Sequence, residues 1–175
     1  MRRGVILIVP AAVASLIMLA GTAWFAGLRL NLTRSYPLGL WRIEPLDGPP
    51  AMGDLVFICP PDSAAFRLAR ERGYLGRGLC PGWFSPLIKT VVATEGQAIA
   101  IGAGVSIDGH PLPHSDLRPT DAAGRALTAF SGGPVSPGSL FLHSDFAGSY
   151  DSRYFGSIPV SGLLGRARPL LTFEP

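Results

Sequence analysis

The feature that most constrains this chain is a run of 25 residues without a charge, from Gly4 to Leu28. A helix of about 20 apolar residues crosses the hydrocarbon core of a bilayer, whereas the apolar region of a cleaved signal peptide usually covers about 7–15 residues. We therefore expect residues 1–30 to form an uncleaved transmembrane anchor. The competing interpretation is a signal peptide cut near the small residues at 21–23.

Charges on the two sides of this run do not decide its orientation. Arg2 and Arg3 precede it, and Arg29, Arg34 and Arg42 follow it, so the positive-inside rule favours neither direction. No second apolar run is long enough to span a membrane. Residues 31–175 are therefore expected to form one domain outside the membrane, tethered by the anchor.

The composition favours β structure for this domain. The chain has 22 Gly and 17 Pro among 175 residues, a turn-rich composition that argues against a helical bundle or a coiled coil. The formal net charge of +3 is too small to indicate a nucleic-acid-binding surface. Short apolar segments bounded by Gly and Pro predict strands at residues 54–59, 87–93, 98–101, 105–108, 110–112, 139–143 and 162–173.

Local signals refine this pattern. Asp108-Gly109, between two of the expected strands, is a strong hairpin signal. Asp62 or Ser63 can cap a short helix over residues 64–72, and Gly73 can end it. Residues 114–137 are polar and rich in Gly and Pro, and we expect them to form a long surface excursion. The predicted fold class is mostly β with a short helical insertion.

Two cysteines, Cys59 and Cys80, enclose the predicted helix. An even number of cysteines in an exported domain indicates a disulfide, and the alternative is two buried free thiols. Two cysteines without a nearby histidine do not form a zinc site. Because no phosphate-binding loop and no complete dinucleotide-binding motif is present, we expect neither a metal nor a cofactor.

Lys89 is the only lysine, beside 14 arginines. Because side chains alternate along a strand, it shares one face of residues 87–93 with Leu87, Val91 and Ala93. Burial disfavours the charged ammonium and lowers the pKa of a lysine, and a neutral amine can act as a general base, which arginine cannot. The alternative is an edge position from which the amine reaches water.

Four segments of the chain carry a more specific pattern. In order, they read Asn-Leu-Thr-Arg-Ser-Tyr-Pro-Leu-Gly-Leu at 31–40, Gly-Asp-Leu-Val at 53–56, Leu-Ile-Lys-Thr-Val-Val-Ala at 87–93 and His-Ser-Asp-Phe-Ala-Gly-Ser-Tyr-Asp-Ser-Arg-Tyr-Phe-Gly at 143–156. Together they resemble the conserved segments of bacterial type I signal peptidases, the family that uses a serine and a lysine. The last segment is the most specific because it is long.

Finer details resemble one subfamily, the TraF-type peptidases of conjugative plasmids. The resemblance rests on Ser-x-Pro-x-Gly-Leu-Trp at 35–41, on the cysteine pair and on the small size of the chain. The general enzymes usually carry Ser-Met-x-Pro-Thr in the first segment and Gly-Asp-Asn at the start of the last. This chain departs from both patterns, which favours a dedicated pilin-like substrate over general preprotein cleavage.

The resemblance implies roles for individual residues. Ser35 is expected to be the nucleophile, and Lys89 the base that later protonates the leaving amine. Ser149 is expected to orient the lysine amine through a hydrogen bond. The backbone N–H of Ser35 and the hydroxyl of Thr33 are expected to hold the oxyanion.

Other residues of the last segment have open roles. Asp151 and Arg153 are expected to form an ion pair that holds this segment, and the alternative is that Asp151 acts on Lys89 directly. A rival mechanism uses His143 and Asp145 in a triad with a serine. Because these two residues are almost adjacent in sequence, distant partners would have to complete such a triad.

The implied function is that of a membrane-anchored serine endopeptidase with the mostly β signal-peptidase fold, acting on a conjugative pilin precursor. Ser35 follows the apolar run by about seven residues, which reach at most about 25 Å when extended, so the site is expected close to the membrane. This places the amino terminus in the cytoplasm and the catalytic domain at the periplasmic face of the bacterial inner membrane. Some relatives also join the new carboxyl end to the pilin amino terminus.

The expected partners are a pilin-like preprotein, the membrane and other proteins of the conjugation apparatus, with no nucleic acid. Two other functions stay open. One is a non-catalytic assembly protein that keeps the fold as a binding module, for which Ser35 and Lys89 would be dispensable. The other is a general signal peptidase, which would rescue secretion when the housekeeping enzyme is depleted.

Overall fold

The computed structural model describes residues 2–174, with side chains from residue 10 onward. Its helices are α1 (Arg2–Phe25), α2 (Ala64–Glu71) and α3 (Ser152–Phe155). It also has two 3₁₀ turns, η1 (Pro81–Trp83) and η2 (Val160–Gly162). Its strands are β1 (Leu28–Asn31), β2 (Leu38–Glu44), β3 (Leu55–Ile58), β4 (Arg77–Cys80), β5 (Leu87–Thr94), β6 (Ala98–Ile101), β7 (Val105–Ile107), β8 (His110–Pro111), β9 (Gly133–Pro134), β10 (Ser139–His143), β11 (Ile158–Pro159) and β12 (Leu163–Phe173). The body is mostly β, as the composition predicts.

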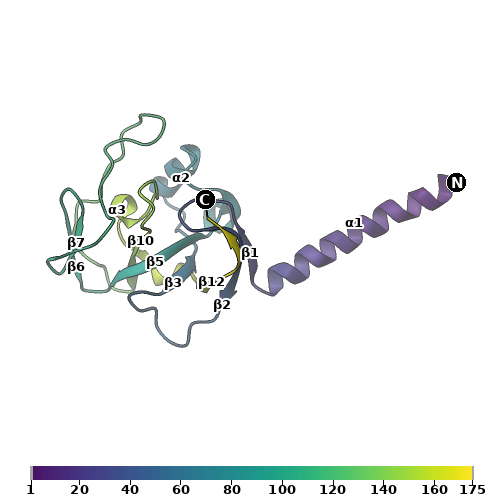
Figure 1. Cartoon of the computed structure of the whole chain (residues 1–175), viewed down its shortest axis with the longest axis horizontal. Coiled ribbons are helices and arrows are strands. Elements are labelled where there is room, and N and C mark those ends of the chain that lie inside the picture. Colours follow the sequence, from purple (N-terminus) through teal and green to yellow (C-terminus); the bar gives the residue numbers. More distant parts are fainter. Residues whose placement is uncertain (1, 175) are drawn as a thin grey trace.

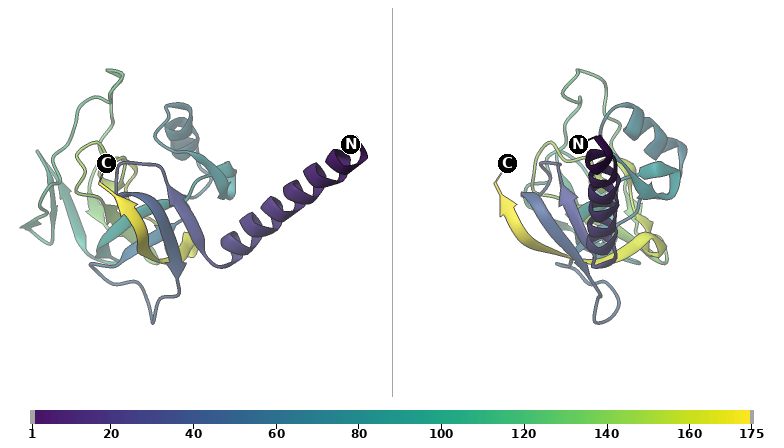
Figure 2. Two further views of the ribbon diagram at one scale, coloured as in Figure 1. Left: turned by 45° about the vertical axis from the view of Figure 1, so that its right-hand side comes forward. Right: turned by 90° about the vertical axis from the view of Figure 1, so that its right-hand side faces the viewer.

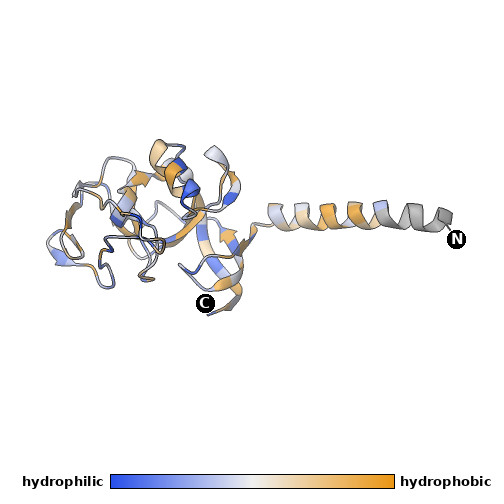
Figure 3. Cartoon of the chain, turned by 90° about the horizontal axis from the view of Figure 1, so that it is seen from above, coloured by the Kyte–Doolittle hydropathy of each residue, from blue (hydrophilic) through white to orange (hydrophobic). Residues whose placement is uncertain are grey.

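Helix α1 projects away from the β body (Figure 1), and Figure 3 shows hydrophobic residues along the part of the helix whose side chains are described. It ends at Phe25, before the end of the uncharged run. A Cβ at Gly27, where φ is +79°, would lie 2.7 Å from the carbonyl oxygen of Ile43, so only glycine fits this turn into β1. Among the described residues, no helix is long and apolar enough to cross a membrane, so the expected transmembrane helix is not found among them. The side chains of residues 1–9 lie outside the described part of the chain.

A seven-stranded sheet forms the main scaffold, with the order β1-β2-β12-β3-β5-β10-β11. Strand β5 lies between β3 and β10, so Lys89 faces Val56 across the ladder and Thr90 faces His143. Leu87, Lys89, Val91 and Ala93 are buried on one face of the strand, and Ile88 is buried on the other face, where it packs with Trp41 and Phe57. This confirms the alternation predicted for residues 87–93.

A four-stranded sheet, in the order β8-β7-β6-β9, lies at the end of the body opposite helix α1 (Figure 1). The predicted hairpin is confirmed: Asp108 and Gly109 both have positive φ, 50° and 80°, as a tight two-residue turn requires. The excursion at 114–137 is mostly exposed. It is attached to the body by hydrogen bonds such as the one from Tyr74 to Asp121, at 2.5 Å.

Helix α2 belongs to a small lobe closed by a disulfide. Ser63 caps the helix by accepting a hydrogen bond from Phe66 N, and Gly73 follows its end with φ +80°. Cys59 and Cys80 are bonded, with Cα atoms 5.4 Å apart. Both the predicted disulfide and the predicted helical insertion are therefore confirmed.

Figure 2 shows β1 and β2 at the side of the body from which α1 leaves. Their pairing brings Asn31 opposite Gly39, so the residues between them form a tight loop. A side chain at Gly39, where φ is +128°, would collide with the carbonyl of Leu171 in β12. The glycine therefore lets β2 pair closely with β12, just after the loop that carries Ser35.

Candidate active site

The structure brings three of the predicted site residues together. Ser35 lies in the loop between β1 and β2, Lys89 in the middle of β5, and Ser149 between β10 and α3. The amine of Lys89 donates a hydrogen bond to the hydroxyl of Ser149 at 3.0 Å, and the hydroxyl of Ser35 donates to the same oxygen at 3.4 Å. A continuous hydrogen-bonded path therefore joins the serine at 35 to the lysine.

Lys89 is almost completely buried, with 3% of its surface exposed. Burial lowers its pKa from the ordinary value of 10.5 to about 8, because the interior disfavours the ammonium form. The charge of Asp151 opposes this shift, and that of Arg153 adds to it. A neutral amine is therefore accessible at mildly alkaline pH.

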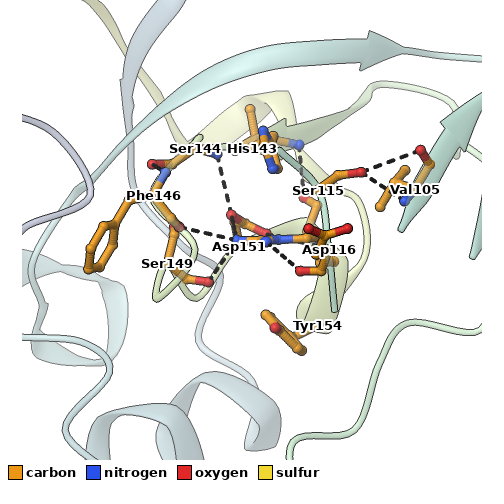
Figure 4. A network of polar contacts seen from close by, with 12 residues as sticks. Val105, Ser115, Asp116, His143, Ser144, Phe146, Ser149, Asp151 and Tyr154 are labelled. Carbon is orange, nitrogen blue, oxygen red and sulfur yellow. Dashed lines mark hydrogen bonds and ion pairs between the residues drawn. The ribbon is translucent and has the colours of Figure 1, made fainter. Parts of the chain in front are cut away.

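Asp151 and Arg153 form a buried ion pair with no exposed surface. Arg153 donates from Nε to Oδ1 of Asp151 at 2.8 Å and from Nη2 to Oδ2 at 2.9 Å. The same guanidinium donates to the carbonyl of Asp116 at 2.9 Å and to the carbonyl of Ser149 at 3.2 Å. Figure 4 shows Asp151 between Ser144 on one side and Asp116 on the other. The pair thus holds the backbone that carries Ser149.

Thr33 lies at the exposed start of the same loop as Ser35. Its hydroxyl donates to Oδ1 of Asn31 at 2.8 Å. Because a hydroxyl has one hydrogen, this bond occupies the hydrogen that the oxyanion role expected of Thr33 requires.

His143 and Asp145 lie near the site without forming a triad. Nδ1 of His143 is 3.6 Å from Oδ1 of Asp145. Nε2 of His143 is buried and has no hydrogen-bond partner among the described residues, so it touches no hydroxyl. Burial also lowers the pKa of His143. This geometry argues against the rival mechanism.

Two cavities meet at Ser35. One, of about 250 Å³, extends toward the lysine and is lined by residues that include Ser35, Lys89, Pro86, Phe146 and Tyr150. The other, of about 500 Å³, lies on the other side and is lined by residues that include Ser35, Tyr36, Thr90, His114 and Asp145. Arg34, Ser35 and Phe146 line both cavities.

Two polar residues next to Ser35 have no assigned role in the sequence-based interpretation. Asn31 bonds several backbone groups of the loop, and the hydroxyl of Ser144 donates to the carbonyl of Ser35 at 2.6 Å. An asparagine before a turn is a recognised signal for such local hydrogen bonds. Ser144 gives no comparable signal, because its partner is 109 residues away.

The buried amine of Lys89 is linked through the hydroxyl of Ser149 to the hydroxyl of Ser35. On a mostly β scaffold, this arrangement is suited to serine peptidase chemistry. The chain belongs to the signal peptidase family, peptidase S26, whose model matches residues 1–171. This confirms the resemblance seen in the sequence segments.

Individual relatives place the chain more narrowly within this family. It is 57% identical over 165 residues to the conjugal transfer protein TraF of Agrobacterium fabrum, covering 93% of this chain and 94% of that protein. It is 58% identical over 153 residues to a probable conjugal transfer protein TraF of Sinorhizobium fredii, covering 87% and 81%. A plasmid transfer protein TraF of Escherichia coli is 39% identical over 162 residues, covering 90% of each chain. The TraF-type resemblance is thereby confirmed.

Among solved structures, a signal peptidase I of Enterococcus faecalis aligns with a TM-score of 0.39 and 16% identity, covering 68% of this chain and 97% of that one.

Proposed function

We propose that this protein is a serine endopeptidase in which Ser35 is the nucleophile and Lys89 the general base. The observation that carries the proposal is the path from Ser35 through Ser149 to a buried lysine. A serine hydroxyl is a weak nucleophile until a base accepts its proton. A neutral Lys89 is such a base, and its pKa of about 8 lies near the operating pH that favours general-base catalysis.

The reaction then follows in two stages. The hydroxyl oxygen of Ser35 attacks the substrate carbonyl carbon while its proton passes to the Lys89 amine, and Ser149 orients both groups. The resulting ammonium donates this proton to the leaving amine, the peptide bond breaks, and an ester to Ser35 remains. A water molecule activated by Lys89 then hydrolyses the ester and restores the free serine.

The negative charge of the tetrahedral intermediate is held by hydrogen bonds from the loop. We assign this role to the backbone N–H of Ser35 and to the hydroxyl of Thr33, which must first turn away from Asn31. Asp151 and Arg153 act from behind the site, because they fix the segment that carries Ser149 and set the charge around Lys89.

The relatives' names support conjugation as the setting. We propose a pilin-like preprotein as substrate, processed at the periplasmic face of the inner membrane, with residues 1–30 as the anchor and residues 31–175 as the peptidase domain. The partners are then the membrane and other conjugation proteins. An ester to Ser35 also permits cyclisation, since an amine that replaces water would join the new carboxyl end to an amino terminus.

Replacement of the relative in Agrobacterium fabrum tests this function. Cells expressing this chain, Ser35→Ala or Lys89→Arg are compared for plasmid transfer frequency and, by mass spectrometry, for the amino-terminal and cyclic peptides of their membrane proteins. We expect transfer and one specific processed terminus only with the unchanged chain. Ser161→Ala, in an exposed part of η2, is the control and should behave like the unchanged chain.

The outcomes separate the three functions. If transfer continues with both active-site variants, the chain is a non-catalytic assembly protein. If many unrelated preproteins are processed, it is a general signal peptidase. A single processed precursor that requires Ser35 and Lys89 supports the proposal.

A further inference from the structure

The loop that carries Ser35 is held by two buried polar side chains, Asn31 and Ser144, which the proposed reaction does not use. Asn31 is 6% exposed and Ser144 is 1% exposed. Asn31 ends strand β1, and Ser144 directly follows strand β10, on the other side of the site. Both make hydrogen bonds to the backbone of the loop.

Asn31 binds the loop at both of its ends. The two hydrogens of its amide nitrogen are shared among the carbonyls of Thr33, Tyr36 and Pro37, which lie at 2.9, 2.9 and 3.0 Å. Its amide oxygen accepts from the backbone N–H of Thr33 at 3.1 Å and from the Thr33 hydroxyl at 2.8 Å. One side chain therefore fixes four peptide groups, those before and after Thr33 and those after Tyr36 and Pro37.

Ser144 fixes the peptide group that follows the nucleophile. Its hydroxyl donates to the carbonyl of Ser35 at 2.6 Å. Its own backbone N–H donates to Oδ2 of Asp151 at 3.3 Å, so the bond to Ser35 is anchored to the buried ion pair. The position of Ser35 is thereby fixed by the same buried Asp151–Arg153 pair that positions Ser149.

These bonds leave one peptide group of the loop without a contact to either side chain. It joins Arg34 to Ser35, and it carries the N–H that the proposed function assigns to the oxyanion. A donor for an oxyanion must be held in place and must remain free to bind the substrate. The loop meets both requirements, because its other peptide groups are fixed and this one is available.

We propose that Asn31 and Ser144 are positioning residues that hold the Ser35 hydroxyl and the Ser35 N–H in their reactive geometry. The inference rests on the proposed function. Their contribution is to the rate of the chemical step. Ser144 binds the carbonyl of Ser35, and Asn31 binds the carbonyls of Thr33 and Tyr36 on either side of it. Neither side chain bonds to the amine of Lys89 or to the hydroxyl of Ser149. A misplacement of about 1 Å at a reacting group can cost about 100-fold in rate.

The test measures peptide cleavage by the full chain in detergent. The probe is a donor–quencher peptide that spans the terminus found in the Agrobacterium comparison. For Ser144→Ala and Asn31→Ala we expect kcat to fall about 10- to 100-fold with KM within about twofold. Asn31→Asp, which keeps an acceptor but sets a carboxylate against three carbonyls, should be lower still. The acidic limb of the pH profile should not move, because the contact between Lys89 and Ser149 is intact.

Ser115→Ala is the matched control. Ser115 is 3% exposed, and its hydroxyl donates to the carbonyl of Leu112 at 2.6 Å and accepts from the N–H of Val105 at 2.9 Å. Its loss therefore removes a donated hydrogen bond of the same length, together with this accepted one, away from the nucleophile. We expect its kcat to stay within about twofold of the unchanged chain. If Ser144→Ala does not accumulate as folded protein, Ser144→Cys, a weaker donor of similar shape, replaces it and should give an intermediate kcat.

Each result has one meaning. A kcat that is unchanged in Ser144→Ala and Asn31→Ala, or a loss that appears only in KM, overturns the positioning role while the endopeptidase stands. A shift of the acidic limb in these variants also overturns it, because it places their effect on the base. If the unchanged chain itself does not cleave the probe, the proposed function is wrong, and the positioning role is wrong with it.

Discussion

Lys89→Met exchanges the buried amine for an uncharged side chain of similar length, and it therefore tests whether the interior opposes the charge on this lysine. Lys89 is 3% exposed, and its amine donates one hydrogen bond, to Ser149. The ammonium form is destabilised in this position, as the lowered pKa of the lysine records. We expect the variant to lose all cleavage and yet to be more stable than the unchanged protein at neutral pH.

The magnitude follows from the pKa. The difference between 10.5 in the unfolded chain and about 8 in the folded protein corresponds to roughly 3 kcal/mol. Below pH 8 both states hold the proton, and the folded state bears the whole cost of burying it. Between pH 8 and 10.5 the unfolded chain still binds the proton while the folded chain does not, so stability rises with pH. Above that window the cost has disappeared.

The variant also loses the hydrogen bond to Ser149, worth about 1 kcal/mol. Lys89→Met should therefore be more stable by about 2 kcal/mol near pH 7. This advantage should shrink as pH rises through about 8 and reverse to a deficit of about 1 kcal/mol near pH 10.5. Taking the difference between the two proteins removes the titration of groups that they share.

Urea unfolding of the full chain in detergent, repeated at intervals from pH 6 to 11, measures both proteins. The slopes with denaturant must agree for the comparison to hold, because the slope reports the surface exposed on unfolding. A difference that does not vary with pH would refute the reasoning, and so would a variant that is less stable at pH 7. Either result would mean that water reaches the amine and that another group is the base.

Three further predictions concern the two groups near this lysine and the disulfide that closes the lobe around α2. Ser149→Ala should lower the cleavage rate about 10- to 100-fold and move the acidic limb to lower pH, because the lost hydrogen bond favours the charged amine; a rate–pH profile measures both, and an unmoved limb would contradict the assignment. Asp151→Asn should lower the free energy of unfolding by about 3–5 kcal/mol, since Arg153 stays buried without its carboxylate; urea unfolding measures this, and a loss below about 1 kcal/mol would mean that the pair is not buried in solution. Replacing both Cys59 and Cys80 by serine should cost about 3 kcal/mol in thermal or urea unfolding, and alkylation of the unreduced protein should label neither thiol; labelling of both would contradict the disulfide.

The parts of the fold that the sequence predicts depend on local patterns. The alternation in residues 87–93 places Lys89 on a buried face because every second residue of a strand shares a face. Asp108-Gly109 forms its turn because both residues tolerate positive φ. The lobe around α2 follows from a capping serine, a terminating glycine and an even number of cysteines. Each of these features depends on residues close together in the chain or, for the disulfide, on the even number of cysteines.

The parts that local patterns do not predict depend on long-range pairing. Strand β12 pairs with both β2 and β3, and Gly39 is needed because the carbonyl of Leu171 in β12 lies where its side chain would be. Strands β1 and β2 are short and partly exposed, and β1 continues the uncharged run that predicts the helix. Nothing in the sequence around Ser144 indicates that its hydroxyl binds the carbonyl of Ser35, because the two residues meet only after the sheet has formed.

Burial makes the neutral form of Lys89 accessible although an aspartate lies nearby, and Arg153 limits how far that aspartate opposes the shift. An unpaired carboxylate at Asp151 would stabilise the ammonium and raise the pKa of Lys89, which is the direction in which its charge acts. Arg153 donates two hydrogen bonds to this carboxylate, and the guanidinium's own charge lowers the pKa of Lys89, which offsets part of the effect of Asp151. The same guanidinium holds the carbonyl of Ser149, so one side chain both favours the neutral amine and positions the hydroxyl that orients it.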